Sequence, residues 1–348
     1  MAKHATLKQI AAQSGVSFQT VSKVLNQKAR VSKDTEERIR RAARELGYRP
    51  NYSARNLRMQ RSGQLGYSWR PPPPDQVNPI LDEFLRSLLR SAEAAGYHIL
   101  CFSYQEGEQQ LNLYRQLIDA NQVDAFILSG VEYDDARISF LRQMSFPFAA
   151  FGRSNPHWGF PCVDLDGAEG MLKVVQHLLA NGHLSIAAIA FPLNSRVGQN
   201  RMEGFSAAMR AAGRAMIESD ILRGEGTYQF GYQSARQLLQ RPQAQRPSAL
   251  VAFNDVMAIG AMQAAREMGY EPGSDLAVTG YDDTPMVAYL TPPLTSVRQP
   301  VDRIGARLVD MLVGILNGAP EDQTPVLFEP ELIIRQSSDF IFADQSGV

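Results

Sequence analysis

Hydrophobic residues recur at helical spacing near the start of the chain. Apolar residues at 7, 10 and 11 form one stripe, and Val21, Val24 and Leu25 form a second. The segment 14–17, SGVS, interrupts the pattern, and Ser17 is a good N-cap for the second helix. A third stripe lies at 39–46. Two short helices joined by a glycine-containing turn are typical of a helix-turn-helix.

After residue 63 the pattern changes to short β-rich runs that alternate with helical stretches. Repeated β-α-β order predicts an α/β fold with parallel sheets and helices on both faces, and about 285 residues suffice for two such subdomains. The expected strands are 64–69, 97–104, 124–129, 146–151, 185–191, 249–253 and 276–280. The expected helices are 80–95, 108–120, 171–181, 201–212, 230–239 and 255–268.

Charge is distributed unevenly between these two regions. Residues 1–62 contain five Lys, nine Arg and four acids, a net charge of +10, whereas the rest of the 348-residue chain carries −11. A basic segment on an acidic body indicates one part that binds a polyanion and one that does not.

Several other classes of protein lack support in the sequence. Cys101 and Cys162 match neither a disulfide framework nor a zinc motif, and the five His form no metal signature, so no metal or cofactor is expected. The segment 224–226, GEG, begins a dinucleotide fingerprint but lacks its third glycine, so no enzyme is predicted. There is no apolar run of membrane-spanning length and no secretion signal, so we expect a cytoplasmic protein without a membrane partner.

The second helix offers side chains that suit the DNA major groove, N-terminal end first. Gln19 can bond bidentately to adenine, Phe18 can contact a thymine methyl, and Lys23 can reach guanine or a phosphate. The alternative is a plain helical hairpin with a solvated polar face, which the charge of +10 on residues 1–62 disfavours.

The runs LKQIAAQSGVSFQTVSKVLN and VSKDTEERIRRAARELGYRPN resemble the head of the lactose-repressor family of bacterial regulators. The match is ungapped over 6–51 and continues through 54–57, ARNL. It places Phe18, Gln19 and Lys23 at the family's base-reading positions, and it implies DNA contacts for Ser17, Thr20 and Asn26. Phe18 and Lys23 replace the Tyr and Arg of the best-known member, so the operator sequence does not transfer.

The resemblance makes residues 51–62 a hinge helix that enters the minor groove. Leu57 would be the wedge between base pairs, with Ala54 one turn earlier and Arg55 near phosphates. A helix of about two turns is marginal in water, so it is expected to fold only when DNA and a second copy hold it. The alternative is a flexible tether with an incidental leucine.

The resemblance continues through LSGV, HLLANGH, RMEGF, FNDVMAIGAM, VTGYDDT and PPLTSVRQP. It implies an effector domain of the type I periplasmic-binding-protein shape, with two subdomains, three crossovers and a ligand between them. The expected boundaries are a head at 1–50, a hinge at 51–62, an effector domain at 63–340 and a tail at 341–348. The expected subdomains are 63–160 plus 292–324 and 161–291 plus 325–340.

Polar residues near expected strand ends are the candidate effector contacts, because ligands of open α/β sheets bind there. Arg201 and Asp282 match the family's sugar-gripping pair, Asn254 a further polar contact and Tyr228 a stacking aromatic. Arg153 is expected to contact either the ligand or an interdomain carboxylate. Two other acids, Asp255 and Asp283, are expected to cap helices. The run PPPP at 71–74 and a valine at 301 depart from the family pattern and leave the effector's identity open.

These features predict a sequence-specific transcriptional regulator, a repressor by resemblance, that reads a near-palindromic double-stranded operator as a homodimer. A small molecule, by resemblance a sugar, would control its affinity for DNA. The same architecture responding to a nucleobase or to a protein co-regulator stays open. A transport-type solute-binding protein would need a secretion signal and no DNA-binding head.

Overall fold

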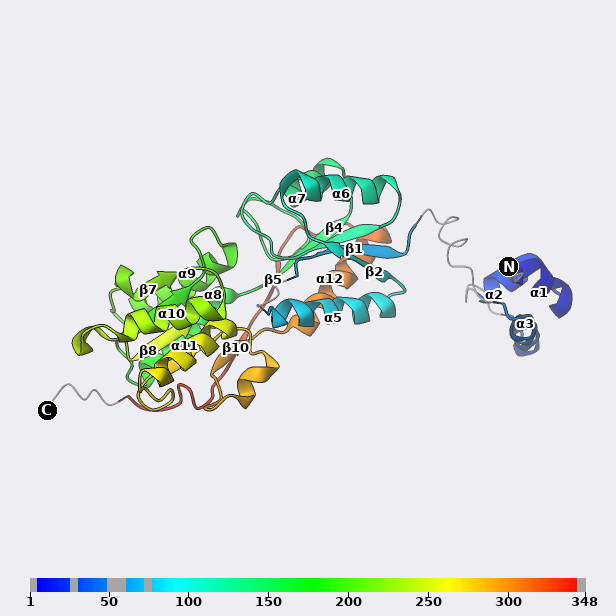
Figure 1. The fold of residues 1–348 in the computed structure, drawn as a ribbon. Helices are drawn as coiled ribbons and strands as arrows, with labels where there is room; N and C mark the ends of the chain where they lie inside the picture. Colours follow the sequence, from blue (N-terminus) through cyan, green and yellow to red (C-terminus); the bar gives the residue numbers. More distant parts are fainter. Residues whose placement is uncertain (1–4, 26–30, 49–60, 72–76, 343–348) are drawn as a thin grey trace. The chain divides into compact units, whose positions relative to one another are not determined.

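The computed structural model describes residues 5–25, 31–48, 61–71 and 77–342. The chain divides into two compact units, and the boundary in the sequence lies between Ser62 and Gly63. The described part of the first unit is all α-helical, and the second is α/β (Figure 1). No helix among the described residues is long and apolar enough to cross a membrane.

Three helices of the first unit pack around a small apolar core. They are α1 (Leu7–Ser14), α2 (Phe18–Leu25) and α3 (Lys33–Glu45). All three were predicted from their apolar stripes, and those stripes meet in one cluster. Its buried members are Ile10, Val21, Val24, Ile39, Ala42 and Ala43.

Local capping fixes the ends of these helices. Gly15 ends α1 in the left-handed conformation, with φ of 67°, and its amide N–H donates to the carbonyl of Ala11. The hydroxyl of Ser17 accepts a hydrogen bond from the amide of Thr20 at 3.1 Å, which confirms Ser17 as a cap of α2. Ser32 caps α3 in the same way. Each hydroxyl satisfies an amide of the first helical turn that has no partner within the helix.

The second unit contains a parallel sheet of six strands in the order β11-β5-β4-β3-β1-β2. Helices α6 (Gly107–Asp119) and α7 (Ala136–Gln143) cover one face, and α5 (Pro79–Ala94) and α12 (Val301–Leu316) cover the other (Figure 1). The strands are β1 (Gln64–Trp69), β2 (His98–Ser103), β3 (Ala125–Leu128), β4 (Phe148–Phe151), β5 (Cys162–Leu165) and β11 (Val326–Phe328).

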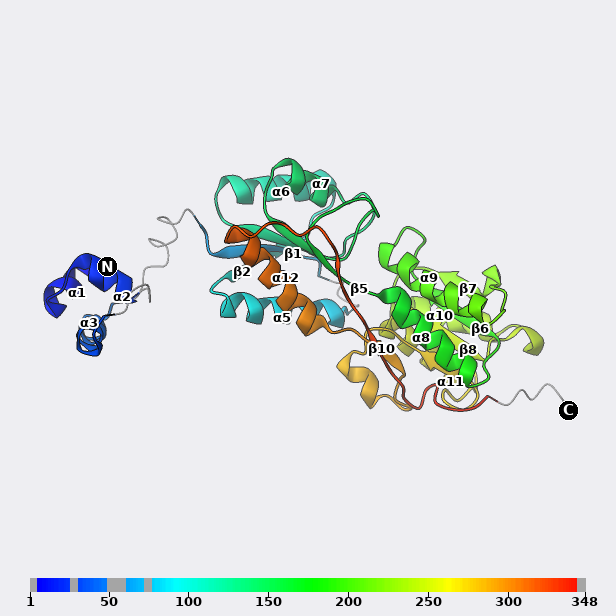
Figure 2. The same ribbon diagram turned by 180° about the vertical axis from the view of Figure 1, so that it is seen from behind.

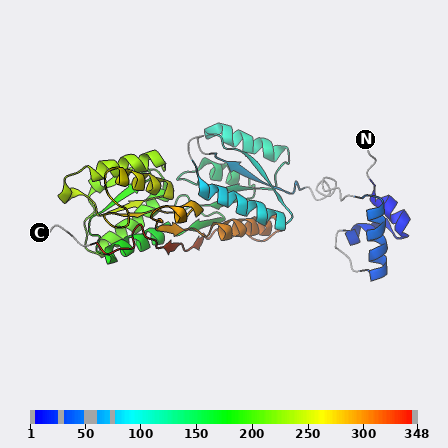
Figure 3. The same cartoon turned by 60° about the horizontal axis from the view of Figure 1, so that its bottom comes forward.

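A second parallel sheet has four strands in the order β7-β6-β8-β9. Figure 3 shows one helix pair on each side of it. The strands are β6 (Ile186–Ala190), β7 (Ile221–Arg223), β8 (Ala249–Ala252) and β9 (Ala277–Thr279). The pairs are α8 (Gly167–Ala180) with α9 (Arg196–Ala211), and α10 (Tyr228–Leu239) with α11 (Asp255–Glu267). Both sheets are apolar on both faces, as burial beneath helices on two sides requires.

Three segments cross between the two sheets (Figure 2). The first joins β5 to α8. The second runs from β9 through β10 (Ser296–Arg298) to α12, and the third leads from β11 into β12 (Glu331–Ile333). Strands β10 and β12 pair antiparallel, so two of the crossovers lie side by side. This arrangement of two subdomains and three crossovers is the one that the resemblance implied.

The pairing of strands differs from the expected subdomain boundaries at three places. Strands β5 and β11 lie in the six-stranded sheet, although 161–291 and 325–340 were assigned to the other subdomain. Thr295, assigned to the first subdomain, pairs with Thr279 of the second sheet. Subdomain boundaries inferred from positions along the chain miss these pairings, because a segment next to a crossover can join the sheet of either subdomain.

All seven strands predicted in this unit are present, with ends that differ by at most two residues. Strands β5, β7, β10, β11 and β12, of three or four residues each, were missed, and so were helices α7 and α12. Helix α9 begins at Arg196 rather than at residue 201, because Ser195 caps it and accepts a hydrogen bond from the amide of Gly198 at 3.2 Å.

Candidate functional site

Helix α2 has one buried and one exposed face. Val21 and Val24 are buried, whereas Phe18, Gln19 and Lys23 are exposed, and the Phe18 side chain is 37% exposed despite being apolar. An exposed aromatic beside an amide and an ammonium group on a capped helix gives a surface able to contact base edges and phosphates.

Of the remaining candidate DNA contacts, two lie at the start of α2 and four lie outside the described residues. Ser17 and Thr20 lie at the N-terminus of α2, where their hydroxyl groups are 2.8 Å apart and the Ser17 hydroxyl serves as the helix cap. Asn26, Ala54, Arg55 and Leu57 lie outside the described residues.

Arg201 lies on the second turn of α9, one turn later than expected, and is 6% exposed. Its Nη1 donates to the carbonyl oxygen of Phe253, which directly follows β8. Its guanidinium carbon lies 3.6 Å from the ring centroid of Tyr281 and 5.6 Å from that of Phe191. Its Nε is buried and has no hydrogen-bond partner in the described part of the chain. A buried guanidinium N–H without a partner is costly, and a bound polar ligand would satisfy it.

Asp282 follows β9 and faces Arg201. Its Oδ1 accepts a hydrogen bond from Nε2 of Gln299 at 2.6 Å and lies 3.5 Å from Nη2 of Arg201. Burial raises the pKa of this carboxyl group, and the neighbouring Arg201 opposes the rise. The structure thus brings the side chains of Arg201 and Asp282 together, and their role in binding an effector stays a prediction.

The other three effector candidates, Asn254, Tyr228 and Arg153, have partners of their own within the chain. Asn254 caps α11 by accepting from the Met257 amide at 2.8 Å, and its own amide donates to the carbonyl of Gly226 at 2.9 Å. Tyr228 is 40% exposed at the start of α10, with its ring stacked on Tyr232 at 6.4 Å between centroids.

Arg153 pairs with a carboxylate inside its own subdomain. Its Nε lies 2.7 Å from Oδ2 of Asp164, and Asp164 belongs to β5, the strand beside β4 in the six-stranded sheet. Arg153 therefore does pair with a carboxylate, as one of its two expected roles required, but that carboxylate lies in the same subdomain.

The expected capping roles of Asp255 and Asp283 are wrong. Asn254 caps α11, and the 3-10 helix after Asp283 has no side-chain cap. Asp255 is wholly buried and accepts hydrogen bonds from Ser296 at 2.5 Å and from the Thr284 amide at 2.8 Å. Burial and the nearby Asp282 carboxylate raise its pKa. Tertiary contacts thus outweigh the local tendency of Asp to cap.

Sequence reasoning missed Gln299, Tyr281 and Phe191, which all contact the Arg201–Asp282 pair. Gln299 directly follows β10, so the strand-end rule that selected Asp282 would have selected it had β10 been recognised. The glycines of the GEG segment also have a packing explanation. A Cβ on Gly226 would lie 2.6 Å from the Phe191 ring and 2.7 Å from the Asn254 amide.

No group of three or more His, Cys, Asp or Glu residues that could hold a metal ion occurs among the described residues.

The fold and these two sites define a class of protein: a helix-turn-helix head joined to a two-subdomain α/β domain of the periplasmic-binding type. The family model "Bacterial regulatory proteins, lacI family" matches residues 6–51, and the model "Periplasmic binding protein-like domain" matches 175–338. This chain belongs to the LacI family of bacterial regulatory proteins.

Individual relatives agree over nearly the whole chain. The transcriptional repressor PurR of Erwinia tasmaniensis is 32% identical, with 96% of each chain covered. A LacI-family regulatory protein from Chloroflexus aggregans is 47% identical over 80% of this chain and 99% of its own, with a TM-score of 0.76. The Lac repressor dimer bound to operator and the anti-inducer ONPF is 28% identical over 97% and 99% of the two chains, with a TM-score of 0.80. By their names these relatives are a transcriptional repressor, a regulatory protein of the LacI family and a repressor bound to its operator.

Proposed function

We propose that this protein is a cytoplasmic repressor that binds a near-palindromic operator as a homodimer and whose affinity for that operator is set by a sugar that binds to the Arg201–Asp282 pair. In this proposal residues 1–50 form the DNA-binding head, 51–62 the hinge and 63–340 the effector domain.

One observation carries the effector assignment. The Nε of Arg201 is buried without a partner, and the hydrogen bonds of the described residues engage only Oδ1 of Asp282. A free donor and a free carboxylate oxygen in adjacent positions match a pair of vicinal hydroxyl groups, each of which donates and accepts. The neighbouring ring of Phe191 offers an apolar surface to the C–H face of a sugar.

The DNA assignment is supported by the exposed face of α2 and by the solved complex of the related Lac repressor dimer with its operator. Dimeric helix-turn-helix proteins read two half-sites one helical turn or more apart, which explains the preference for palindromes. Leu57 as a minor-groove wedge, with Ala54 and Arg55 beside it, is part of the same proposal.

A thermal-shift screen of the full chain against D-glucose, D-ribose, cellobiose and hypoxanthine tests the effector assignment. A bound sugar at about 100 times its Kd should raise Tm by roughly 5–10 °C. Asp282→Asn and Arg201→Ala should abolish the shift. Asp220→Asn should keep it, because Asp220 pairs with Arg241 next to the start of β7, at the other edge of the sheet. A shift that survives both site variants would refute the assignment, and a shift with hypoxanthine alone would replace the sugar by a nucleobase.

Selection from random-sequence duplexes tests the DNA assignment separately. The recovered sites should be palindromic, and their affinity should fall steeply with salt because Lys and Arg displace counterions. Leu57→Ala should weaken operator binding and leave the thermal shift unchanged. Equal operator affinity in the two proteins would refute the wedge.

A further inference from the structure

Two successive residues beside the effector site have unusual backbone conformations. Asp282 has φ of 118° and Asp283 has φ of 49°, and neither is glycine. Such conformations cost about 1–3 kcal/mol each and persist only where surrounding contacts enforce them. The residue assigned to grip the effector therefore has a conformation that its surroundings must maintain.

The amides of this loop are each held by a different group. The Asp282 amide donates to the carbonyl of Val297 at 2.9 Å, and the Asp283 amide donates to the hydroxyl of Ser296 at 3.0 Å. The next amide, that of Thr284, donates to the buried carboxylate of Asp255 at 2.8 Å. Strand β10 and helix α11 together fix the backbone of the loop.

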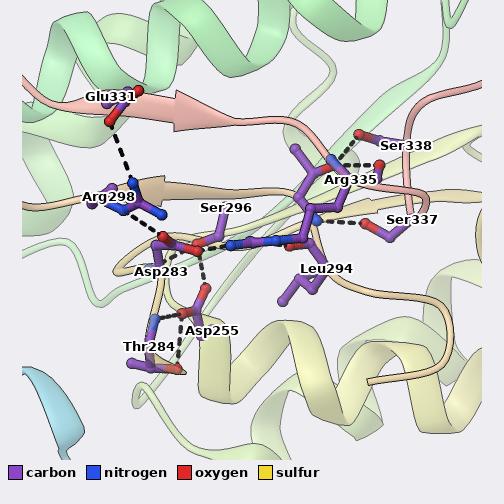
Figure 4. A network of polar contacts seen from close by, with 11 residues as sticks. Asp255, Asp283, Thr284, Leu294, Ser296, Arg298, Glu331, Arg335, Ser337 and Ser338 are labelled. Carbon is purple, nitrogen blue, oxygen red and sulfur yellow. Dashed lines mark hydrogen bonds and ion pairs between the residues drawn. The ribbon is translucent and has the colours of Figure 1, made fainter. Parts of the chain in front are cut away.

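The side chain of Asp283 is 3% exposed and lies between two guanidinium groups (Figure 4). Its Oδ2 accepts a hydrogen bond from Nε of Arg298 at 2.7 Å, and its Oδ1 forms an ion pair with Nη1 of Arg335 at 2.7 Å whose geometry is not that of a hydrogen bond. Arg335 also donates to the carbonyl of Leu294 at 2.7 Å, and Arg298 lies 3.5 Å from Glu331. A buried carboxylate with two charged partners is held firmly, because losing either leaves charge unpaired.

The two arginines belong to different crossovers. Arg298 is the last residue of β10, which leads from the second sheet to α12. Arg335 follows β12, which returns from the first sheet, and its amide donates to the Thr295 hydroxyl at 2.8 Å. A single carboxylate next to Asp282 thus joins two of the three segments that connect the subdomains.

We propose that Asp283 is a positioning residue. With Arg298 and Arg335 it holds Asp282 against Arg201 and ties the effector-contacting loop to both crossovers, so that occupancy of the site changes the geometry of the connection between subdomains. That this site binds an effector rests on the proposed function. The mechanical link between the loop and the crossovers rests only on the contacts described above.

Hydrogen–deuterium exchange of the full chain, without any added compound, tests this link. Asp283→Asn should speed exchange at least tenfold both at the amides of 282–284 and at that of Arg335, and Asp283→Glu should restore slow exchange at both. Arg335→Gln should speed exchange at 282–284, although it lies about fifty positions away in the sequence. The matched control Asp220→Asn removes an ion pair at the other edge of the sheet and should alter neither segment.

Different outcomes separate this proposal from a general loss of stability. Faster exchange at 282–284 with the Arg335 amide unchanged would overturn the link. If Asp283→Asn speeds exchange throughout the second sheet, Arg298→Gln decides, because the Arg298 side chain is half exposed and its loss leaves the core intact. Faster exchange confined to 282–284 and Arg335 then supports the link. Unchanged exchange at these amides refutes it. If the wild-type protein responds to no compound in the thermal-shift screen, the effector assignment is refuted. The exchange experiment still tests the link, because it uses no added compound.

Discussion

The guanidinium group of Arg201 lies over the buried ring of Tyr281, with 3.6 Å between its central carbon and the ring centroid. Tyr281 is wholly buried, and its hydroxyl has no hydrogen-bond partner among the described residues. The ring face, not the hydroxyl, therefore positions the arginine, since a cation is attracted to the electron-rich face of an aromatic ring.

Replacing Tyr281 should separate these two contributions. Tyr281→Phe keeps the ring and removes an unsatisfied hydroxyl, so stability should change by less than about 1 kcal/mol and the effector-induced thermal shift should persist. Tyr281→Leu removes the ring face, and we expect a loss of about 2 kcal/mol in stability together with loss of the shift. Urea unfolding and thermal shift measure the two effects. An unchanged shift in the leucine variant would show that the ring does not position Arg201.

Helix α2 offers a matched pair of substitutions, one on each face. Phe18→Ala should lower affinity for a selected operator about tenfold without altering the stability of the head, because the side chain is exposed. Val21→Ala should cost about 2 kcal/mol in stability, because Val21 is wholly buried in the core of the three helices. Fluorescence anisotropy and circular-dichroism melting report the two properties. If Phe18→Ala bound operator as tightly as the wild type, the exposed face of α2 would not be the reading face.

Close packing of α8 against α9 depends on Gly204. A Cβ at this position would lie 1.9 Å from the carbonyl oxygen of Ala168, a backbone atom that can move only with its helix. Gly204→Ala should therefore cost about 3 kcal/mol. Gly314→Ala is the control in another helix, where the nearest atom is Ala319 Cβ at 3.7 Å, and it should stabilise by about 0.5–1 kcal/mol. Equal effects of the two changes in urea unfolding would contradict this account of the helix crossing.

His183 should make stability fall with acid. It is wholly buried, lies 5.1 Å from the rings of Phe340 and Phe342 between centroids, and burial lowers its pKa to about 4. The unfolded chain, with a histidine pKa near 6.5, binds more protons between these values, so stability is intact above pH 6.5 and is lost towards pH 4. Between pH 6.5 and 5 the loss should be about 2 kcal/mol, as measured by urea unfolding. In His183→Gln the free energy of unfolding should fall by that much less over the same pH range. An unchanged pH dependence would assign the loss to other titratable groups.

Local patterns in the sequence predicted most of the secondary structure and the three helices of the head. The stripe of Val21, Val24 and Leu25 and the cap at Ser17 concern residues within one or two helical turns, and the structure matches them. Seven of the ten strands in the two sheets were likewise predicted, because burial on both faces leaves a continuous apolar run, whereas β5, β7 and β11 were missed. The pairing of Arg201 with Asp282 came from resemblance to the LacI family, since the two residues are 81 positions apart and no local pattern relates them.

Only the tertiary structure decided the partners of the buried charges. Asp255 and Asp283 have the local setting of helix caps, but their partners Ser296, Arg298 and Arg335 lie on the two later crossovers, in β10 and just after β12. Arg153 found its carboxylate on the neighbouring strand for the same reason. A charged side chain withdrawn from water takes whichever opposite charge the fold brings within reach, and that choice depends on how strands are ordered in a sheet rather than on their order along the chain. The sequence by itself therefore determined most of the helices and strands, because those depend on local patterns, and the packing of those segments decided which polar groups meet.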